Sequence, residues 1–372
     1  MRSRRILVVL PLLIAIISGS LHAQRRRKKT DEELTQTHEI PKDPPAAVIA
    51  DAQRIAFLAA PLSSKGLLSQ QIRDGLKAIK GQAHGAPILK VRAFVAGTGD
   101  LRRVHAIVSE EFTNWKQPLP AVTSIRIGAL PQEGAQVVLE AVTSDKKVVN
   151  PHGVAFFSGQ QVTSKIPMER VEPLLRESVS RLQLAMRGVK IAPENALRVT
   201  CFTTSLTDAG QQRTHLGTVF PRAAITLVQA LRGLSAGLVE CEAVARTTTA
   251  PSSAMTFANP EGLEPSPNYS QVAFVNAPKV ILSGSQLAFR AQDADVRLAF
   301  DRLKRAVEQS GGSLNHTAFT SYYPLTQSTI DKIRQIRFEF LDKAHPPAST
   351  MLLFEGLPSL DASFAVEVVA LP

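Results

Sequence analysis

Three glutamates stand at matching places in the sequence and are its best candidates for chemistry. Each lies in a short apolar run that alternates like a strand, and the runs are VVLEAV with Glu140, VECEAV with Glu242 and AVEVVAL with Glu367. A carboxylate held near a substrate can position or activate a water molecule. On an exposed edge strand, the same group would only be a solvated charge. The elements around these glutamates therefore decide which interpretation applies.

Metal and thiol chemistry receive less support. The chain has no CxxC or HExxH motif and no cluster among its 8 histidines, so we expect neither a metal site nor a cofactor. Cys201 and Cys241 both lie in apolar, strand-like runs, RVTCFTT and LVECEAV. They can form a disulfide if the two strands are neighbours in an exported protein, or they can be two buried thiols. The sequence leaves both possibilities open.

The elements that would position the glutamates recur three times. Alternating runs begin at Leu89, Leu197 and Leu314, a pattern typical of strands with one buried face. We align one phenylalanine in each run, namely Phe94, Phe202 and Phe319. Before each run, apolar residues three and four positions apart predict an amphipathic helix. These residues are Leu68, Ile72, Leu76 and Ile79, then Val171, Leu175, Val179, Leu182 and Met186, and finally Val296, Phe300, Leu303 and Val307.

Each repeat predicts a β-β-α-β-α-β-β unit of about a hundred residues, which is a usual domain size. We predict an α+β protein with units at residues 47–146, 147–249 and 268–372, and a linker at 250–267. A sheet with both helices on one face leaves its other face uncovered. Three units in one chain can cover these faces for one another, so we expect a monomer.

The net charge of +11 is concentrated in the N-terminal segment, because residues 1–29 hold eight of these charges and no acid. The remaining chain is too close to neutral for a protein that binds DNA or RNA. Residues 1–23 have the basic start, apolar stretch and small-residue end of a cleaved signal peptide. We therefore predict a secreted or periplasmic protein, without membrane contact after cleavage, whose residues 24–46 form a charged flexible lead. The alternative is a retained anchor, because QRRRKK after the apolar stretch resists translocation.

The stretch PNYSQVAFVNAPKVILSGSQ at residues 267–286 resembles the start of the Rid (YjgF, L-PSP endoribonuclease-like) family, which has a Tyr-Ser-Gln strand and then a Ser-Gly-Gln strand end. VAFFSGQQ at 154–161 is similar to the second half of this signature, and VRAFVAGTGDLRRVHAIVSEEF is similar to the family's strand and second helix. The resemblance covers nearly all of residues 48–372. It implies three tandem Rid-like (chorismate-mutase-like) domains, arranged as an intramolecular pseudo-trimer with a ligand cleft at each domain boundary.

Active members of this family hydrolyse enamines and imines, such as 2-aminoacrylate, to a keto acid and ammonia. The resemblance assigns the water-positioning role to the three glutamates, and it requires an arginine to bind the substrate carboxylate. In the strand where the family has this arginine, the three copies here have Val122, Ala223 and Ser349. Arg222 lies one residue early, which on a strand points it to the opposite face, unless a bulge turns it back.

The resemblance also implies residues that bind ligand. Tyr269 matches the family's cleft tyrosine, while His105 and Arg334 fall where the family has a polar residue in its second helix. The loop that approaches the ligand is matched twice, by Ser158 with Gly159 and by Ser283 with Gly284. The plainer alternatives are a packed aromatic, solvated helix residues and turns that need small residues. In the first repeat this loop reads LAAPLSS and has lost the signature.

Because every copy lacks the arginine, we predict an exported scaffold that binds small molecules or a protein and has lost deamination. The first alternative is a residual enamine or imine deaminase at one boundary, using Arg222 and one glutamate. A ribonuclease, suggested by the family's other name, is least favoured, because the body of the chain is near neutral and has no histidine pair or basic groove.

Overall fold

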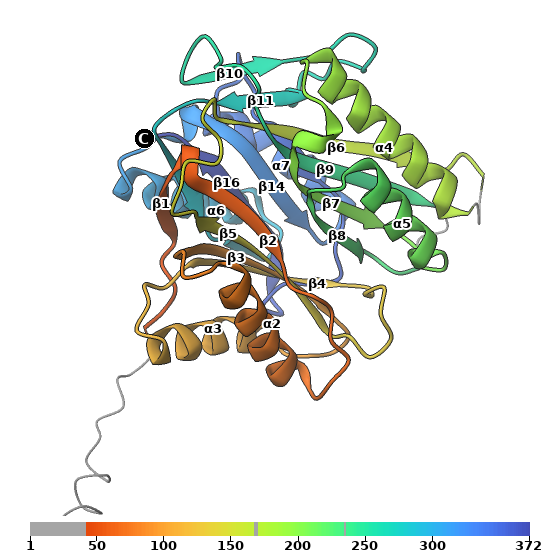
Figure 1. Cartoon of the computed structure of the whole chain (residues 1–372), viewed down its shortest axis with the longest axis vertical. Coiled ribbons are helices and arrows are strands. Elements are labelled where there is room, and N and C mark those ends of the chain that lie inside the picture. Colours follow the sequence, from red (N-terminus) through yellow and green to blue (C-terminus); the bar gives the residue numbers. More distant parts are fainter. Residues whose placement is uncertain (1–41, 167–169, 234–235) are drawn as a thin grey trace, which may run out of the picture. The chain divides into compact units, whose positions relative to one another are not determined.

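The computed structural model describes residues 42–166, 170–233 and 236–372, and it shows a mixed α+β protein with three sheets (Figure 1). The predicted signal peptide and most of the predicted charged lead lie outside the described residues. Among the described residues, no helix is long and apolar enough to cross a membrane.

The first sheet has the strand order β2-β5-β3-β4 and carries the helices α2 and α3. Its strands are β2 (Ile55–Ala59), β5 (Val137–Ser144), β3 (Ile88–Ala96) and β4 (Ala121–Ile127). The helices are α2 (Leu68–Gln82) and α3 (Arg102–Asn114), which lie together on one face of this sheet, at the bottom of Figure 1.

The second sheet has the order β10-β11-β6-β9-β7-β8. Its strands are β10 (Met255–Ala258), β11 (Val272–Val275), β6 (Val154–Thr163), β9 (Leu238–Arg246), β7 (Ala196–Thr203) and β8 (Ala224–Gln229). The helices α4 (Val171–Gly188) and α5 (Ala209–Val219) pack beside each other on this sheet.

The third sheet has the order β1-β12-β16-β14-β15, and β13 also pairs with β16. Its strands are β1 (Ala47–Asp51), β12 (Lys279–Ser283), β13 (Gln286–Phe289), β14 (Thr317–Pro324), β15 (Ala348–Met351) and β16 (Ala362–Ala370). Its helices are α6 (Asp293–Gln309) and α7 (Gln327–Ile336). Short 3₁₀ turns complete the chain at Ala52–Arg54, Pro193–Asn195, Leu314–His316 and Arg337–Glu339.

All three sheets share one pairing pattern. The strands β3, β7 and β14 each pair in parallel with the strand that follows the second helix, and antiparallel with the last strand of the unit. A parallel pair needs a long crossover, and α3, α5 and α7 supply it. The predicted apolar stripes of α2, α4 and α6 are all buried against their sheets, as the three- and four-residue spacing requires.

Two strands pair outside the unit that contains them in sequence. β1 comes before the first sheet in sequence but pairs with β12 of the third sheet, and β11 pairs with β6 of the second. The segment predicted as the linker, 250–267, also contributes a strand, because β10 (Met255–Ala258) pairs with β11. A free strand edge presents unpaired N–H and C=O groups, and these added strands pair with them.

The faces that carry no helix pack against one another. One apolar cluster contains side chains from strands of all three sheets, including Val142, Phe156, Val244, Leu282 and Phe319. A second apolar cluster also contains side chains from strands of all three sheets, and its aromatic members are Phe94, Phe202, Tyr323 and Phe354. Its aromatic rings meet edge to face, with Phe202 and Phe354 centroids 5.5 Å apart, a favoured geometry for such rings.

The strand register corrects one part of the sequence alignment. Phe94 and Phe202 each lie opposite the residue two positions before the glutamate of the neighbouring strand. In the third sheet this place is taken by Tyr323, opposite Ala365, and not by Phe319. The third alternating run is therefore shifted by four residues relative to our alignment. Because side chains alternate every two residues along a strand, a shift by an even number leaves the same face buried, and the sequence pattern does not reveal the error.

Candidate functional site: a buried cluster of acids and bases

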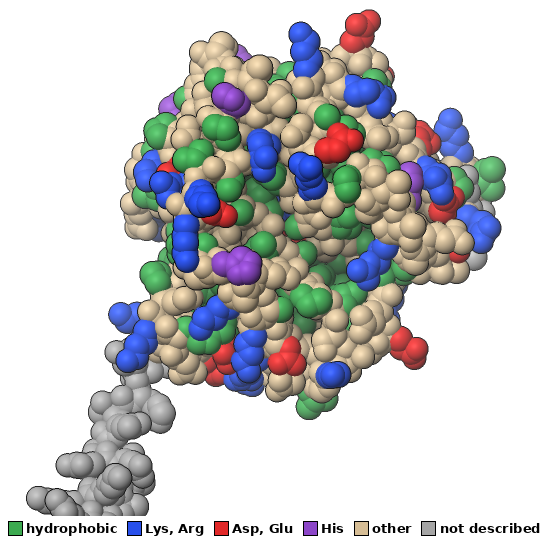
Figure 2. Space-filling view, viewed as in Figure 1, with side chains coloured by type: hydrophobic (Ala, Val, Ile, Leu, Met, Phe, Trp, Pro, Cys, Tyr) green, Lys and Arg blue, Asp and Glu red, His purple; other side chains and the backbone are tan. Residues whose placement is uncertain are grey.

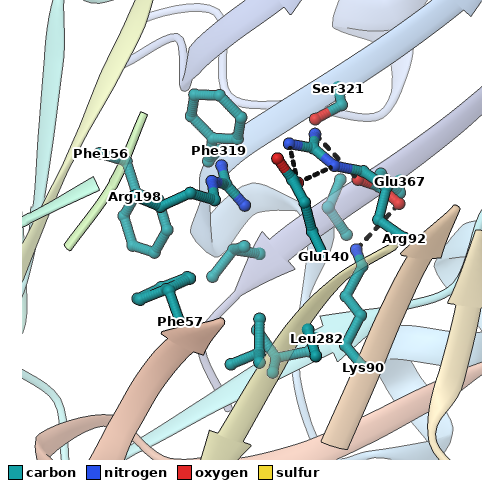
Figure 3. Close-up of a pocket in the computed structure, with 14 residues that line it drawn as sticks. Phe57, Lys90, Arg92, Glu140, Phe156, Arg198, Leu282, Phe319, Ser321 and Glu367 are labelled. Atoms are coloured by element: carbon teal, nitrogen blue, oxygen red, sulfur yellow. Dashed lines mark hydrogen bonds and ion pairs between the residues drawn. The ribbon is translucent and has the colours of Figure 1, made fainter. Parts of the chain in front are cut away.

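The three predicted glutamates lie together in the interior, each contributed by a different sheet. Glu140 on β5, Glu242 on β9 and Glu367 on β16 are 3%, 0% and 4% exposed. Their strands each have neighbours on both sides, so the interpretation as exposed edge charges does not apply. Figure 3 shows Glu140 and Glu367 on either side of one arginine, Arg92 of β3.

Arg92 connects all three carboxylates. Its Nε donates to Glu140 Oε2 at 2.8 Å, and its Nη2 donates to Glu242 Oε1 at 2.9 Å. Its Nη1 lies 3.9 Å from Glu367 Oε1 and donates to the Tyr323 hydroxyl at 3.3 Å. The Tyr323 hydroxyl in turn donates to Glu367 at 3.0 Å. One guanidinium fork is thus shared by acids from three sheets, a use for which its rigid set of donors is suited.

Two further cations complete the cluster. Lys90, two residues before Arg92 on β3, lies 2.9 Å from Glu367 Oε2, and Arg198 of β7 lies 2.9 Å from Glu242 Oε1. The hydroxyls of Thr200 and Thr123 donate to Glu140 and Glu367, respectively. The cluster therefore balances three cations (Lys90, Arg92 and Arg198) against three carboxylates.

The electrostatics keep Glu140 and Glu367 ionised. Burial alone raises the pKa of Glu140, but Arg92 and Arg198 outweigh it, so that this pKa falls to about 2. Burial acts in the same direction on Glu367, and Lys90 with Arg92 still hold its pKa below the usual range. The pKa of Lys90 is lowered by burial despite the opposing effect of Glu367. A carboxylate so firmly ionised and paired is a poor general base, because a base must accept a proton near the working pH.

The cations of this cluster were missed at the sequence level. Lys90 and Arg92 are two residues apart in LKVRAFV, and Arg198 stands at the matching place in LRVTCFT. Alternation puts these side chains on the face that looks away from the helices. Charges repeated on the interior face of strands are the signal that would have identified them, because such charges must be paired when they are buried.

The first Ser-Gly loop lies where the second sheet meets β15 of the third. Ser158 Oγ accepts a hydrogen bond from the Ser349 backbone N–H at 2.8 Å and donates to the Ser270 carbonyl. Ser158 and Gly159 form a bulge in β6. A side chain at Gly159 would place its Cβ 1.9 Å from Glu240 Oε1, so glycine is needed here to leave room for that carboxyl group.

The second Ser-Gly loop meets β4 of the first sheet. A Cβ at Gly284 would lie 2.7 Å from the Val122 carbonyl oxygen, and Ser285 N–H donates to that oxygen at 3.3 Å. Ser283 Oγ accepts a hydrogen bond from Val368 N–H of its own sheet. Both loops thus pack directly on the strand positions, Val122 and Ser349, where the family resemblance implies an arginine.

The remaining predicted residues do not join the three glutamates. Arg222 is exposed in the turn before β8, and Ala223 beside it is half-buried. His105 lies on α3, where burial lowers its pKa and Asp43 opposes this effect. Arg334 is exposed on α7 and forms an ion pair with Asp331 at 3.7 Å.

Glu240 is a buried acid that the sequence reading overlooked, because it counted one glutamate in VECEAV where there are two. Burial, together with the nearby Glu242, raises its pKa to about 8, although the Met351 backbone N–H opposes this shift. Tyr269 lies close enough for Glu240 to raise the pKa of its hydroxyl, in addition to the larger effect of burial. Glu240 is therefore protonated at neutral pH, unlike Glu140 and Glu367.

A hollow of about 150 Å³ is lined by residues of the second and third sheets, and Glu240 is not among them. Gln161, which lies opposite Glu240 in the strand register, lines it, and so does Met351. Arg334 is the cation among its lining residues. The hollow thus has a positively charged side chain and lies next to the strand positions that flank Glu240.

The two cysteines form a disulfide between directly opposite residues of β7 and β9. No group of three or more histidine, cysteine, aspartate or glutamate side chains within the described ranges is arranged to hold a metal ion.

Comparisons with known proteins give structural similarity alone. No family model matches the sequence, and no curated protein matches it. Among solved structures, a conserved Rid family protein from Yersinia pestis is 16% identical, covers 32% of this chain and 98% of its own, and gives a TM-score of 0.28. A protein described as a putative endoribonuclease L-PSP from Entamoeba histolytica is 19% identical over 31% of this chain and 98% of its own, with a TM-score of 0.23. RidA from an Antarctic Psychrobacter is 18% identical, covers 24% of this chain and 79% of its own, and gives a TM-score of 0.23.

Proposed function

We propose that this chain is an exported, non-catalytic binding scaffold built from three tandem Rid-like units, which form a pseudo-trimer within one molecule. Its partners would be small molecules or a protein, and its boundary clefts would be degenerate. The order of the sequence motifs supports three units, and the shared pairing pattern of the three sheets agrees with it. Export rests on the signal-like residues 1–23.

The observation that carries this proposal is the use made of the three glutamates. All of them are buried and paired with Arg92, Lys90 or Arg198. A carboxylate held in this way is poorly available as a base for a substrate, and removing it from its cation would leave both charges unpaired in the interior. We infer that these residues hold the sheets together.

The boundary loops support the same conclusion. At Val122 and Ser349, backbone hydrogen bonds to the Ser-Gly loops occupy the place where a substrate carboxylate would need a cation. Losing that cation removes an interaction that typically stabilises bound substrate and transition state by a few kcal/mol, on the order of a hundredfold or more in rate.

The test is turnover of 2-aminoacrylate, with an arginine-bearing Rid enzyme as the positive control. We expect no hydrolysis above the spontaneous rate. The constructive variant is Ser349→Arg, which returns a cation to the boundary that holds Gly159, Tyr269 and Glu240, and weak turnover is expected to appear. Its matched control is Ala223→Arg, which should stay inactive because the facing loop has lost its signature. Wild-type turnover equal to that of the positive control would refute the proposal that the chain is a non-catalytic scaffold.

A second candidate function, residual imine hydrolysis at one boundary, is favoured by the protonation of Glu240. An acid with a pKa of about 8 can donate a proton at neutral pH. In the nearby hollow, which Glu240 itself does not line, Arg334 could bind a carboxylate in place of Arg222, which lies exposed in its turn.

This candidate predicts a division between two variants. Arg334→Gln should raise KM, whereas Glu240→Gln should lower kcat. The rate of the wild-type chain should decline above pH about 8, where Glu240 ionises. Arg222→Gln serves as the control and should behave like the wild type. If Arg222→Gln alone abolishes turnover, the catalytic cation is Arg222 and the assignment to Arg334 fails.

A further inference from the structure

A second hollow lies directly above the buried cluster, where strands of all three sheets meet, and it is separate from the boundary beside Glu240. Its wall is apolar, with Phe57, Phe156, Phe319, Leu282, Val142 and Val369 (Figure 3). Its floor is polar and contains Lys90, Arg92, Arg198, Glu140, Glu367 and Ser321. In Figure 2, hydrophobic side chains gather in the hollow at the middle of the face in view. We call this site the central funnel.

The floor of the central funnel has one surplus positive charge. Three cations line it, but only two of the three carboxylates do, because Glu242 is fully buried and does not reach the hollow. Glu242 lies 2.9 Å from Arg198 and makes the cluster as a whole neutral, so the surplus is confined to the lining of the hollow. A single negative charge placed in the funnel would meet this surplus.

Arg198 is the group best placed to receive that charge. Its Nη2 donates to Glu242 Oε1, and within the described part of the chain both its Nε and Glu242 Oε2 are buried without a hydrogen-bond partner, so the rest of the guanidinium is the part that can face the funnel. Its guanidinium lies over the Phe57 ring, 5.5 Å from the centroid, and Figure 3 shows it beside Phe156, on the side of Glu140. A buried donor without an acceptor is unfavourable, and a carboxylate is the acceptor whose geometry matches a guanidinium edge.

The size of the central funnel limits what can enter it. The enclosed part has room of about 30 Å³, enough for a carboxylate group or for a water or two, while the whole hollow with its open mouth measures about 550 Å³. A polar head group therefore fits at the floor. The rest of the ligand must lie along the phenylalanine wall, where Phe156 and Phe319 have ring centroids 5.8 Å apart.

We propose that the central funnel binds a small monocarboxylate with an apolar tail, its carboxylate on the free edge of Arg198 and its tail against Phe57, Phe156 and Phe319. This site rests on the proposed function as a binding scaffold and identifies a ligand class for it. It needs neither Glu240 nor the boundary hollow, so binding at the funnel is independent of any turnover.

The test uses hexanoate as the probe and hexan-1-ol as its uncharged counterpart, with binding measured by calorimetric titration. Hexanoate should bind, and hexan-1-ol should bind at least about tenfold more weakly, because it cannot use the guanidinium edge. Arg198→Gln should weaken hexanoate binding by about tenfold or more. Arg222→Gln, which changes an exposed arginine in the turn before β8 and outside the funnel, should leave it unchanged.

Two further variants keep the test decisive if Arg198→Gln does not fold. Phe57→Ala leaves every charge in place and should weaken hexanoate binding by several-fold. Arg198→Lys keeps the charge but loses the planar fork, and should weaken it as well. The proposal is overturned if hexanoate does not bind the wild-type chain, if folded Phe57→Ala and Arg198→Lys bind it like the wild type, or if Arg334→Gln is the variant that loses binding. That last outcome would place the ligand at the boundary beside Glu240. None of these outcomes bears on the turnover assay, which tests the proposed function separately.

Discussion

Glu242 and Glu240 are two residues apart on β9, and both are buried, yet their environments are opposite. Glu242 accepts hydrogen bonds from Arg92 and Arg198, each at 2.9 Å. Glu240 has no ion pair among the described residues and has a pKa of about 8. The comparison shows that burial alone does not define the role of an acid. A paired acid joins sheets together, whereas an unpaired one remains able to exchange a proton near neutral pH.

The presence of a single arginine, Arg92, among three glutamates also bears on whether the protein can be a symmetric trimer. In a symmetric trimer of identical chains, any residue at this position would be present three times, and three arginines would repel one another. Here β7 has Thr200 and β14 has Ser321 at the positions that face the other two glutamates in the strand register. Three sheets of different sequence in one chain allow this asymmetric arrangement.

The strongest test of the carboxylates paired with Arg92 is the variant Arg92→Met. This change leaves Glu140 and Glu242 buried without their shared partner, and breaking a buried pair in this way typically costs about 3–5 kcal/mol. We expect the free energy of unfolding, measured by urea denaturation, to fall by that amount. Arg222→Met, at an exposed position, is the matched control and should change it by no more than about 0.5 kcal/mol. Similar losses in both variants would mean that the cluster does not stabilise the fold.

Replacing the unpaired acid Glu240 should have the opposite effect and raise the free energy of unfolding at high pH, and Glu240→Gln tests this. The folded state raises the pKa of Glu240 from 4.5 to about 8, so the folded protein binds the proton more tightly, and stability is lost as the pH rises through this interval. Above pH about 8, Glu240→Gln should therefore be more stable than the wild type, on the order of a few kcal/mol. Below pH 4.5 the difference should disappear.

Glu242→Gln is the control for this prediction, because it makes the same substitution two residues along the same strand. It removes a partner of Arg92 and Arg198 and should destabilise the protein at neutral pH. Thermal unfolding of both variants across pH 4–9 gives the comparison. If both variants shift stability in the same direction at high pH, the contrast between the two acids is incorrect.

Low pH should reduce the contribution of Glu140 to the free energy of unfolding. The pKa of Glu140 is held at about 2 in the folded protein, against 4.5 for the free group. Its contribution is complete above pH 4.5 and is lost as the pH falls through about 2, on the order of 3 kcal/mol. Glu140→Gln should therefore be less stable than the wild type at pH 6, and this deficit should shrink at pH 2. A deficit that does not change with pH would show that Glu140 acts only through packing.

A smaller effect is expected from Gly159→Ala at the boundary. The added methyl group would overlap the Glu240 carboxyl, and such overpacking typically costs about 1–3 kcal/mol. The double variant Gly159→Ala with Glu240→Ala should recover most of this loss, because the shortened side chain makes room. No recovery in chemical denaturation would mean that glycine is needed at 159 for its backbone conformation instead.

The helices and strands were predictable because their physics is local. The apolar stripes of α2, α4 and α6 and the alternating strands follow from spacing alone. The exchanged strands β1 and β11 were not predictable, because every free sheet edge offers the same hydrogen bonds and only the tertiary arrangement selects one. The register of β14 was misjudged because both Phe319 and Tyr323 fit an alternating pattern.

The candidate site was foreseen only in part. Glu140, Glu242 and Glu367 were singled out correctly as equivalent residues, but the resemblance implied separate clefts, whereas the structure brings all three to Arg92. Such convergence depends on how three sheets face one another, which single-strand patterns do not contain. Glu240 could have been found from the second glutamate in VECEAV, since alternation puts it on the same interior face as Glu242.

The central claim is that one chain supplies all three sheets around the cluster and needs no second copy. Sedimentation equilibrium of the purified chain tests it directly over a range of concentrations. We expect one species with the mass of a single chain, 40.2 kDa for all 372 residues and less if the signal-like segment is removed. A stable trimer of the chain at all concentrations would contradict the intramolecular assembly.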